Sequence, residues 1–195
     1  MHVLQELPEG YEEKLKIDLQ NDKKTMLIIN IAANVAMLLM LVLMHFIVPF
    51  TSYIDLEGSL LVYFLKIFLI LAAYGAYLIL HEATHGIVMK LFGAKEVKFG
   101  FTGLYAYAGS SADYFDKLSY YCVALAPLTV WSIILFVICL IVPGSWVWLP
   151  YFVQAGNIAG SFGDLYVFAR LLKMKEIYVK DTGVNMSVFG KLITG

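Results

Sequence analysis

Residues 63–93, YFLKIFLILAAYGAYLILHEATHGIVMKLFG, place two histidines and a glutamate inside an otherwise apolar segment. Positions i and i+4 of a helix share a face, so the imidazoles of His81 and His85 can reach one metal ion. Glu82 lies beside them and can act as a general base toward water. A charged group at a bilayer centre costs about 2.5–3.5 kcal/mol on insertion scales, and such residues mark functional sites by default. The motif therefore predicts a metal centre, in preference to a polar helix patch satisfied by backbone or water.

The composition is that of a membrane protein. Of the 195 residues, 61% are hydrophobic and only 15% are charged, whereas soluble domains carry about 25% charged residues. The net charge of −1 gives no electrostatic reason to expect a nucleic-acid partner. The length predicts a single membrane domain over residues 1–195. We expect a cell-membrane protein that has the lipid bilayer as a partner.

Four apolar stretches are long enough to span a bilayer, which needs about 20 helical residues. They cover residues 25–48, 60–92, 118–142 and 147–172. An N-terminal segment over 1–24 and a tail over 173–195 flank them. Between the second and third stretches, residues 97–109 are rich in Tyr, Phe and Gly and predict short strands with tight turns. The predicted fold class is an all-α integral membrane protein with about four transmembrane helices and one short β-hairpin-like segment.

Basic residues between these stretches set the predicted orientation. Every second connection is basic, with Lys23, Lys24, Lys90, Lys95, Lys98, Lys117, Arg170, Lys173, Lys175 and Lys180. The loop at 49–59 carries Asp55 and Glu57 without any Lys or Arg, and the turn at 143–146 is uncharged. We therefore predict a multi-pass protein with both termini, segments 1–24 and 173–195, in the cytoplasm.

A third metal ligand is expected, because a catalytic zinc usually has three protein ligands and an open position for water. The fourth stretch contains one intramembrane acid, Asp164, six residues or about 9 Å inside Arg170. His85 precedes Lys90 by five residues, about 7.5 Å on the same side. His45 lies near the opposite end of the first stretch, at the wrong depth. Asp164 is therefore the predicted third ligand, and the alternative is an Asp paired with a lysine or with tyrosine hydroxyls.

Asn157 is a further polar residue of the fourth stretch. It lies seven residues before Asp164, about two turns away and hence on the same face. Its amide could hold a substrate carbonyl or a developing oxyanion. It could equally make an interhelical hydrogen bond. Both interpretations stay open at the level of sequence.

Several segments together resemble a known family. They are HEATHG at 81–86, Ala126-Pro127 in the next helix and GSFGDL at 160–165, with LPEGY and VKDTGVNMSVF near the two ends. They are similar to the family named Putative zincin peptidase, small multi-pass membrane proteins related to the site-2 intramembrane zinc metalloproteases. The chain differs from site-2 proteases in having Leu165 after Asp164 instead of glycine. The resemblance implies that His81, His85 and Asp164 bind Zn²⁺, that Glu82 is the catalytic base and that Asn157 faces the substrate.

We therefore expect an enzyme, a zinc metalloprotease that cleaves a membrane-embedded or juxtamembrane protein segment. Zinc lowers the pKa of water, and Glu82 would take the water's proton and pass it to the leaving amine. One alternative is a metal-binding membrane transporter or sensor, although a carrier has no need for the non-ligand carboxylate of Glu82. The other is a non-catalytic zinc-stabilised membrane subunit, although structural zinc sites usually have four ligands and only three are found.

Overall fold

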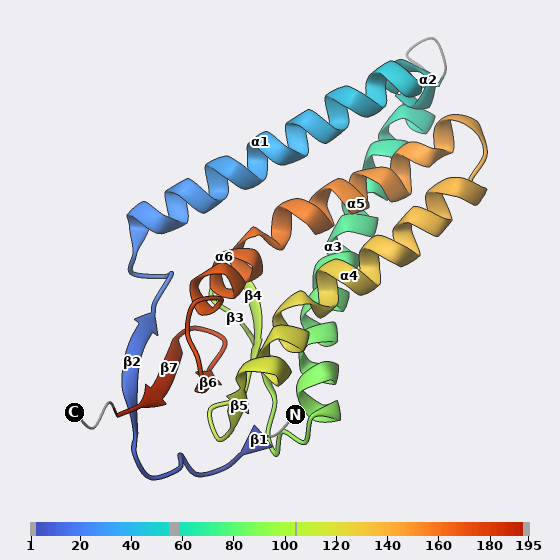
Figure 1. Cartoon of the computed structure of the whole chain (residues 1–195). Coiled ribbons are helices and arrows are strands. Elements are labelled where there is room, and N and C mark those ends of the chain that lie inside the picture. The colour runs from blue at the N-terminus through green and yellow to red at the C-terminus, as the bar shows by residue number, and fades with distance from the viewer. Residues whose placement is uncertain (1–2, 55–58, 104, 193–195) are drawn as a thin grey trace. The chain divides into compact units, whose positions relative to one another are not determined.

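The computed structural model describes residues 3–54, 59–103 and 105–192, and most of these are helical (Figure 1). The helices are α1 (Lys23–Ile47), α2 (Phe50–Ile54), α3 (Leu60–Leu91), α4 (Lys117–Ile141), the 3-10 helix η1 (Gly144–Val147), α5 (Trp148–Gly160) and α6 (Phe162–Leu171). The strands are β1 (Val3–Leu4), β2 (Tyr11–Ile17), β3 (Lys98–Phe101), β4 (Ala106–Gly109), β5 (Tyr114–Asp116), β6 (Ile177–Asp181) and β7 (Met186–Lys191). Asp55 and Glu57, which entered the predicted orientation, lie outside the described residues.

Three helices of the described chain, α1, α3 and α4, are long and apolar enough to cross a membrane. Large apolar side chains on all three are highly exposed, among them Leu38 at 63%, Phe68 at 63% and Ile133 at 66%. A soluble monomer rarely exposes so much contiguous apolar surface, whereas a lipid-facing helix does. The structure therefore agrees with a membrane location.

The prediction of one long helix over 147–172 is wrong, because that segment forms two shorter helices, α5 and α6, separated at Ser161. The Ser161 hydroxyl donates to the Asn157 carbonyl at 2.9 Å, a back-bond that often bends helices. Gly160 and Gly163 flank the break and lower the helix propensity around it. The break leaves Asp164 in the first turn of α6.

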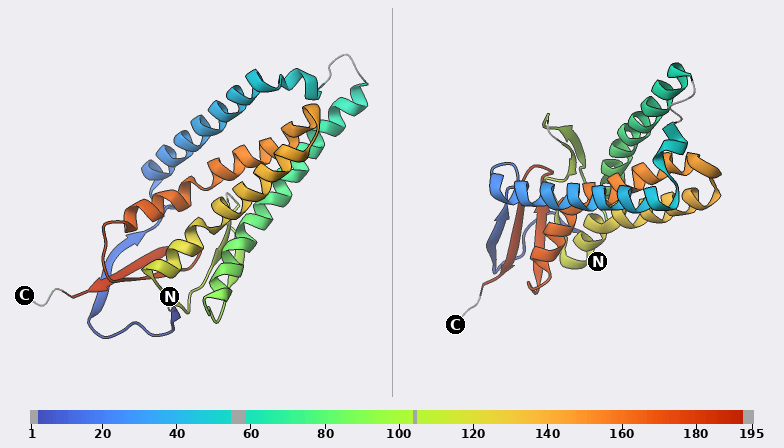
Figure 2. Two further views of the ribbon diagram at one scale, coloured as in Figure 1. Left: turned by 45° about the vertical axis from the view of Figure 1, so that its right-hand side comes forward. Right: turned by 90° about the horizontal axis from the view of Figure 1, so that it is seen from above.

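The all-α prediction is also wrong, because the chain contains a five-stranded sheet in the order β1-β5-β6-β7-β2. Every neighbouring pair is antiparallel, with Val179 opposite Val188 in β6 and β7. Strands from the two ends of the sequence, β2 and β7, lie side by side in every view (Figures 1 and 2). The predicted hairpin is confirmed as β3 paired with β4, apart from residue 104, which lies outside the described residues.

The described chain divides into two compact units by its internal contacts. The first comprises residues 1–29, 82–126 and 163–195, and contains both sheets. Alternate residues of β6 and β7 are buried, which is the pattern of a sheet with one covered face. They form one buried cluster with residues from the ends of three helices: Met89 of α3, Val123 of α4 and Leu171 of α6. The cluster ties these helix ends to the sheet.

The second unit comprises residues 30–81 and 127–162 and is helical. One buried cluster joins Met44, Tyr53, Ile70, Val147 and Trp148, and the indole of Trp148 donates to the Val48 carbonyl at 3.0 Å. A second joins Tyr77, Leu135 and Val153 from α3, α4 and α5.

The β3–β4 hairpin packs directly on α3 beside the sequence motif. A Cβ added at Gly86, the residue after His85, would lie 2.3 Å from Cζ of Phe99 and 3.2 Å from a methyl group of Val97. The absence of a side chain at position 86 therefore lets Phe99 and Val97 approach the helix this closely. Gly75, on the same helix, has no such neighbour within 4 Å.

We predict that Gly86→Val lowers the melting temperature in detergent and that Gly75→Val, with the same change in helix propensity, has a smaller effect. Overpacking a close contact costs about 1–3 kcal/mol, in addition to the propensity term shared by both variants. Thermal unfolding followed by intrinsic fluorescence would measure the difference. Equal melting temperatures for the two variants would contradict the close packing of β3 on α3.

Candidate metal centre

His81 and His85 lie one turn apart on α3 and are both buried, at 7% and 8% exposure. The helix is continuous from Leu60 to Leu91, so it alone sets the position of His81 relative to His85. The 3.6-residue period directs both imidazoles to the same side of the helix. The histidine pair of the motif is therefore arranged as two ligands of one ion require.

Asp164 approaches His85 from the first turn of α6, with its Oδ1 3.6 Å from Nε2 of His85. A helix N-terminus favours a carboxylate, because the unpaired N–H groups there carry partial positive charge. One ligand atom from each of His81, His85 and Asp164 lies within 4.8 Å of the others. Among the described residues, these three are the ones grouped closely enough to share a metal ion.

The donor set fits zinc. Zinc ligands lie about 2.0–2.2 Å from the ion, so two ligands of a tetrahedral site are about 3.4 Å apart. The separation of 3.6 Å between His85 and Asp164 is close to that value. Two imidazoles and one carboxylate would leave a fourth position for water or substrate, as catalytic zinc sites do.

The orientation of His85 depends on a proline in the neighbouring helix. Its Nδ1 lies 2.9 Å from the Val123 carbonyl oxygen, which can only accept, so Nδ1 carries a hydrogen and the neutral ring has its lone pair on Nε2. In a regular helix the carbonyl of Val123 would accept from the N–H of residue 127, but Pro127 has none. The proline therefore leaves this carbonyl available to the histidine. Pro127, four residues after Val123, was the sequence signal for this contact.

Glu82 follows His81 on α3 and is partly buried. It interacts electrostatically with His85 and is not one of the three grouped ligands. This placement is consistent with a carboxylate that acts on water instead of binding the ion. Its role as base stays a prediction.

Asn157 is fully buried in α5, and its side chain bonds to two other helices. Its Oδ1 accepts from the Tyr77 hydroxyl of α3 at 2.6 Å, and its Nδ2 donates to Oγ of Ser132 in α4 at 3.0 Å. These contacts correspond to the interhelical hydrogen bond of the sequence analysis. Its contact with a substrate stays a prediction. His45, set aside as a ligand, accepts from the Phe50 N–H at 3.1 Å in the turn between α1 and α2.

A partly buried polar pair that the sequence did not indicate links α4 to the sheet. The Tyr120 hydroxyl donates to Oδ2 of Asp181 at 2.7 Å, and Oδ1 of Asp181 accepts from the Gly183 N–H at 2.7 Å. Burial raises the pKa of the Asp181 carboxyl, against the effect of these two hydrogen bonds. Asp181 also interacts electrostatically with His85 and Asp164, so it belongs to the electrostatic surroundings of the centre.

The comparison with protein families found that residues 74–179 match a family described as Putative zincin peptidase. The matched range covers more than half of the 195 residues and includes the motif, the hairpin and Asp164. The chain belongs to this family. Membership in the Putative zincin peptidase family indicates a zinc metallopeptidase. The comparisons with curated proteins and with solved structures found no match.

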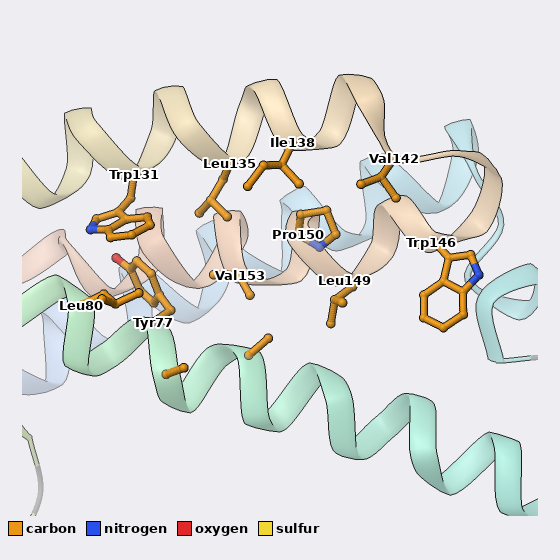
Figure 3. Close-up of a pocket in the computed structure, with 12 residues that line it drawn as sticks. Tyr77, Leu80, Trp131, Leu135, Ile138, Val142, Trp146, Leu149, Pro150 and Val153 are labelled. Carbon is orange, nitrogen blue, oxygen red and sulfur yellow. The ribbon is translucent and has the colours of Figure 1, made fainter.

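This zincin-family chain also has an apolar pocket of about 310 Å³ within its second unit, between α3, α4, η1 and α5 (Figure 3). Trp131, Leu135 and Ile138 of α4 project into it, with Val142 just after that helix, opposite Leu149, Pro150 and Val153. Tyr77 and Trp131 lie at one end and Trp146 at the other. Since Tyr77 precedes His81 by one turn of α3, the pocket extends along the helix toward the first histidine of the motif.

We predict close to one zinc per chain in detergent-purified protein and a clear loss in Asp164→Ala, because that change removes one of three ligands. Elemental analysis measures the zinc content. Glu13→Ala, which removes an exposed carboxylate of β2, is the control and should keep full zinc. Wild-type protein without zinc, after purification in the absence of chelators, would contradict the centre.

Proposed function

We propose that this member of the family is an intramembrane zinc endopeptidase that hydrolyses a membrane-embedded or juxtamembrane protein segment. The main support is the approach of Asp164 in α6 to His85 in α3, 3.6 Å apart, with His81 and Glu82 also on α3. Helix α3 is itself long and apolar enough to cross a membrane. A three-ligand site beside a carboxylate is expected of hydrolysis and not of a closed structural zinc site.

The chemistry divides between the ion and the chain. When bound, zinc supplies the Lewis acidity that makes water a nucleophile at neutral pH and polarises the scissile carbonyl. Glu82 accepts a proton from the water as its oxygen bonds to the carbonyl carbon, and returns that proton to the amine nitrogen as the C–N bond breaks. His81, His85 and Asp164 hold the ion and do not exchange protons. One water is consumed and two chain ends are formed.

The strand order of the five-stranded sheet supports an even number of membrane crossings. Strands β1 and β2 precede α1, β5 lies between α3 and α4, and β6 and β7 follow α6. One hydrogen-bonded sheet has to lie on one side of a membrane, because open strands are not stable in lipid. Segment 144–171 would then return the chain after α4, as two helices in place of one. The basic residues of the sequence assign this side to the cytoplasm.

The substrate has to present an extended backbone, because a helix hides its carbonyl groups in its own hydrogen bonds. The two-stranded sheet offers a place for such a backbone. Strand β3 pairs only with β4 among the described residues, and it contacts α3 at Gly86, next to His85. A substrate strand added to this hairpin would run beside the metal ligands.

We predict that Glu82→Gln abolishes proteolysis, with a fall in rate of about 10²–10⁴-fold for loss of a general base, while zinc content stays near that of the wild type. Mass spectrometry of new protein N-termini, compared between cells that express each form, would reveal cleavage sites in any substrate that the cells contain. Glu96→Gln, which changes an exposed carboxylate outside the helices, is the control. Identical sets of cleavage sites for wild type and Glu82→Gln would refute the protease.

We predict that a reporter fused after residue 195 is active only when it can work in the cytoplasm. A reporter inserted in the loop at 49–59 should be active only on the outer side, since α1 separates that loop from the sheet. Paired fusions to an enzyme that folds outside the cell and to a cytoplasmic fluorescent protein would measure both positions. Activity of the two fusions on the same side would contradict four crossings.

A further inference from the structure

We infer that Tyr77 and Asn157 are positioning residues that set the tautomer of His81 and so present its Nε2 to the metal. The inference rests on the proposed zinc site but concerns two residues outside the group of three candidate ligands. It follows from a series of three hydrogen bonds, from His81 to Tyr77, from Tyr77 to Asn157 and from Asn157 to Ser132.

The donor and acceptor roles in this series of hydrogen bonds are set at Asn157. Its Nδ2 lies 3.0 Å from Oγ of Ser132 and 3.4 Å from the Leu128 carbonyl oxygen, which can only accept. This contact places the NH₂ group toward α4 and the carbonyl oxygen Oδ1 toward Tyr77. Oδ1 is an acceptor and has no hydrogen to give, so the bond of 2.6 Å between it and the tyrosine uses the single hydroxyl hydrogen of Tyr77.

The tyrosine oxygen then accepts from His81. Nδ1 of His81 lies 2.8 Å from Oη of Tyr77, whose hydrogen is already directed at Asn157. Nδ1 therefore donates, which places the ring hydrogen on Nδ1 and the lone pair on Nε2. The opposite arrangement would turn the tyrosine hydrogen to His81 and leave two oxygen lone pairs facing each other 2.6 Å apart. In a buried site such an unmade hydrogen bond is unfavourable, because no water replaces it.

Burial strengthens this series of hydrogen bonds. Tyr77 is 3% exposed and Asn157 is fully buried, so water does not compete for their hydrogen bonds. The Tyr77 ring is held edge-on against Trp131 at a centroid distance of 6.1 Å, which limits its rotation. Both histidines of the motif thus present Nε2, but by different means. His85 relies on the backbone carbonyl of Val123, whereas His81 relies on side chains that substitution can remove.

The test is Tyr77→Phe, which removes one hydroxyl and keeps the ring that lines the pocket. The matched control is Tyr74→Phe on the same helix, since the Tyr74 ring stacks on Tyr77 and its hydroxyl bonds to no described residue. Loss of the hydrogen-bond partner of a ligand histidine typically lowers metal affinity about 10–100-fold. We expect that loss of zinc affinity for Tyr77→Phe and no change for Tyr74→Phe, measured by competition with a chelator in detergent.

Two further measurements separate positioning from a general loss of stability. Asn157→Leu removes the acceptor, and combining it with Tyr77→Phe should weaken zinc binding no more than the stronger single variant, because both act through the same bond. Nitrogen-15 chemical shifts of labelled histidine report the tautomer directly, and the chain has only four histidines. In zinc-free wild type we expect His81 with its hydrogen on Nδ1, and in Tyr77→Phe a shift toward the Nε2–H form.

The outcomes distinguish this inference from the proposed function. Equal zinc affinity of Tyr77→Phe and Tyr74→Phe, in a wild type that binds zinc, would overturn the positioning role and leave the zinc site intact. A wild type that binds no zinc would remove the basis of the protease, and the tautomer measured in that protein would still decide the inference. His81 with its hydrogen on Nε2 in the zinc-free wild type would overturn it.

Discussion

The need to satisfy polar groups inside apolar helices governs this structure. Buried polar atoms without partners cost several kcal/mol, and lipid offers no water to replace them. The two imidazoles of α3 are buried, and each has a partner at Nδ1: the Val123 carbonyl for His85 and the Tyr77 hydroxyl for His81. The Val123 carbonyl is available because α4 contains a proline. The Tyr77 hydroxyl belongs to a buried tyrosine–asparagine pair between α3 and α5.

The five-stranded sheet holds together helix ends that come from distant parts of the sequence. Its buried face holds the ends of α3, α4 and α6 in one cluster, and those ends carry His85, Val123 and Asp164. The break at Ser161 serves the same arrangement, because it makes Asp164 a first-turn residue of a new helix. His85 and Asp164 therefore lie on helix ends that a folded sheet holds, and this position suits the proposed protease, which must admit both water and a protein segment.

Local patterns carried much of the prediction. The spacing of His81 and His85, the depth of Asp164 and the aromatic hairpin after α3 were all visible in the chain, and the structure groups the three ligands and forms the hairpin. Local sequence patterns did not predict which strands pair when the strands are far apart in the sequence. VKDTGVNMSVF alternates like a strand, yet nothing local shows that β7 pairs with β2, whose residues lie more than 160 positions earlier. An apolar run over 147–172 likewise does not reveal the helix break at Ser161.

By itself, the sequence determined the chemistry: two histidines and a glutamate at helical spacing, one further acid, and helices apolar enough for a membrane. These are properties of neighbouring residues and of composition, which side-chain periodicity expresses directly. Only the tertiary structure decided that His85 bonds to the Val123 carbonyl and that Tyr77 bonds to Asn157, because these contacts join helices distant in sequence. Such contacts depend on how the helices pack and on which acceptor each buried N–H or O–H group reaches. No local sequence pattern shows either.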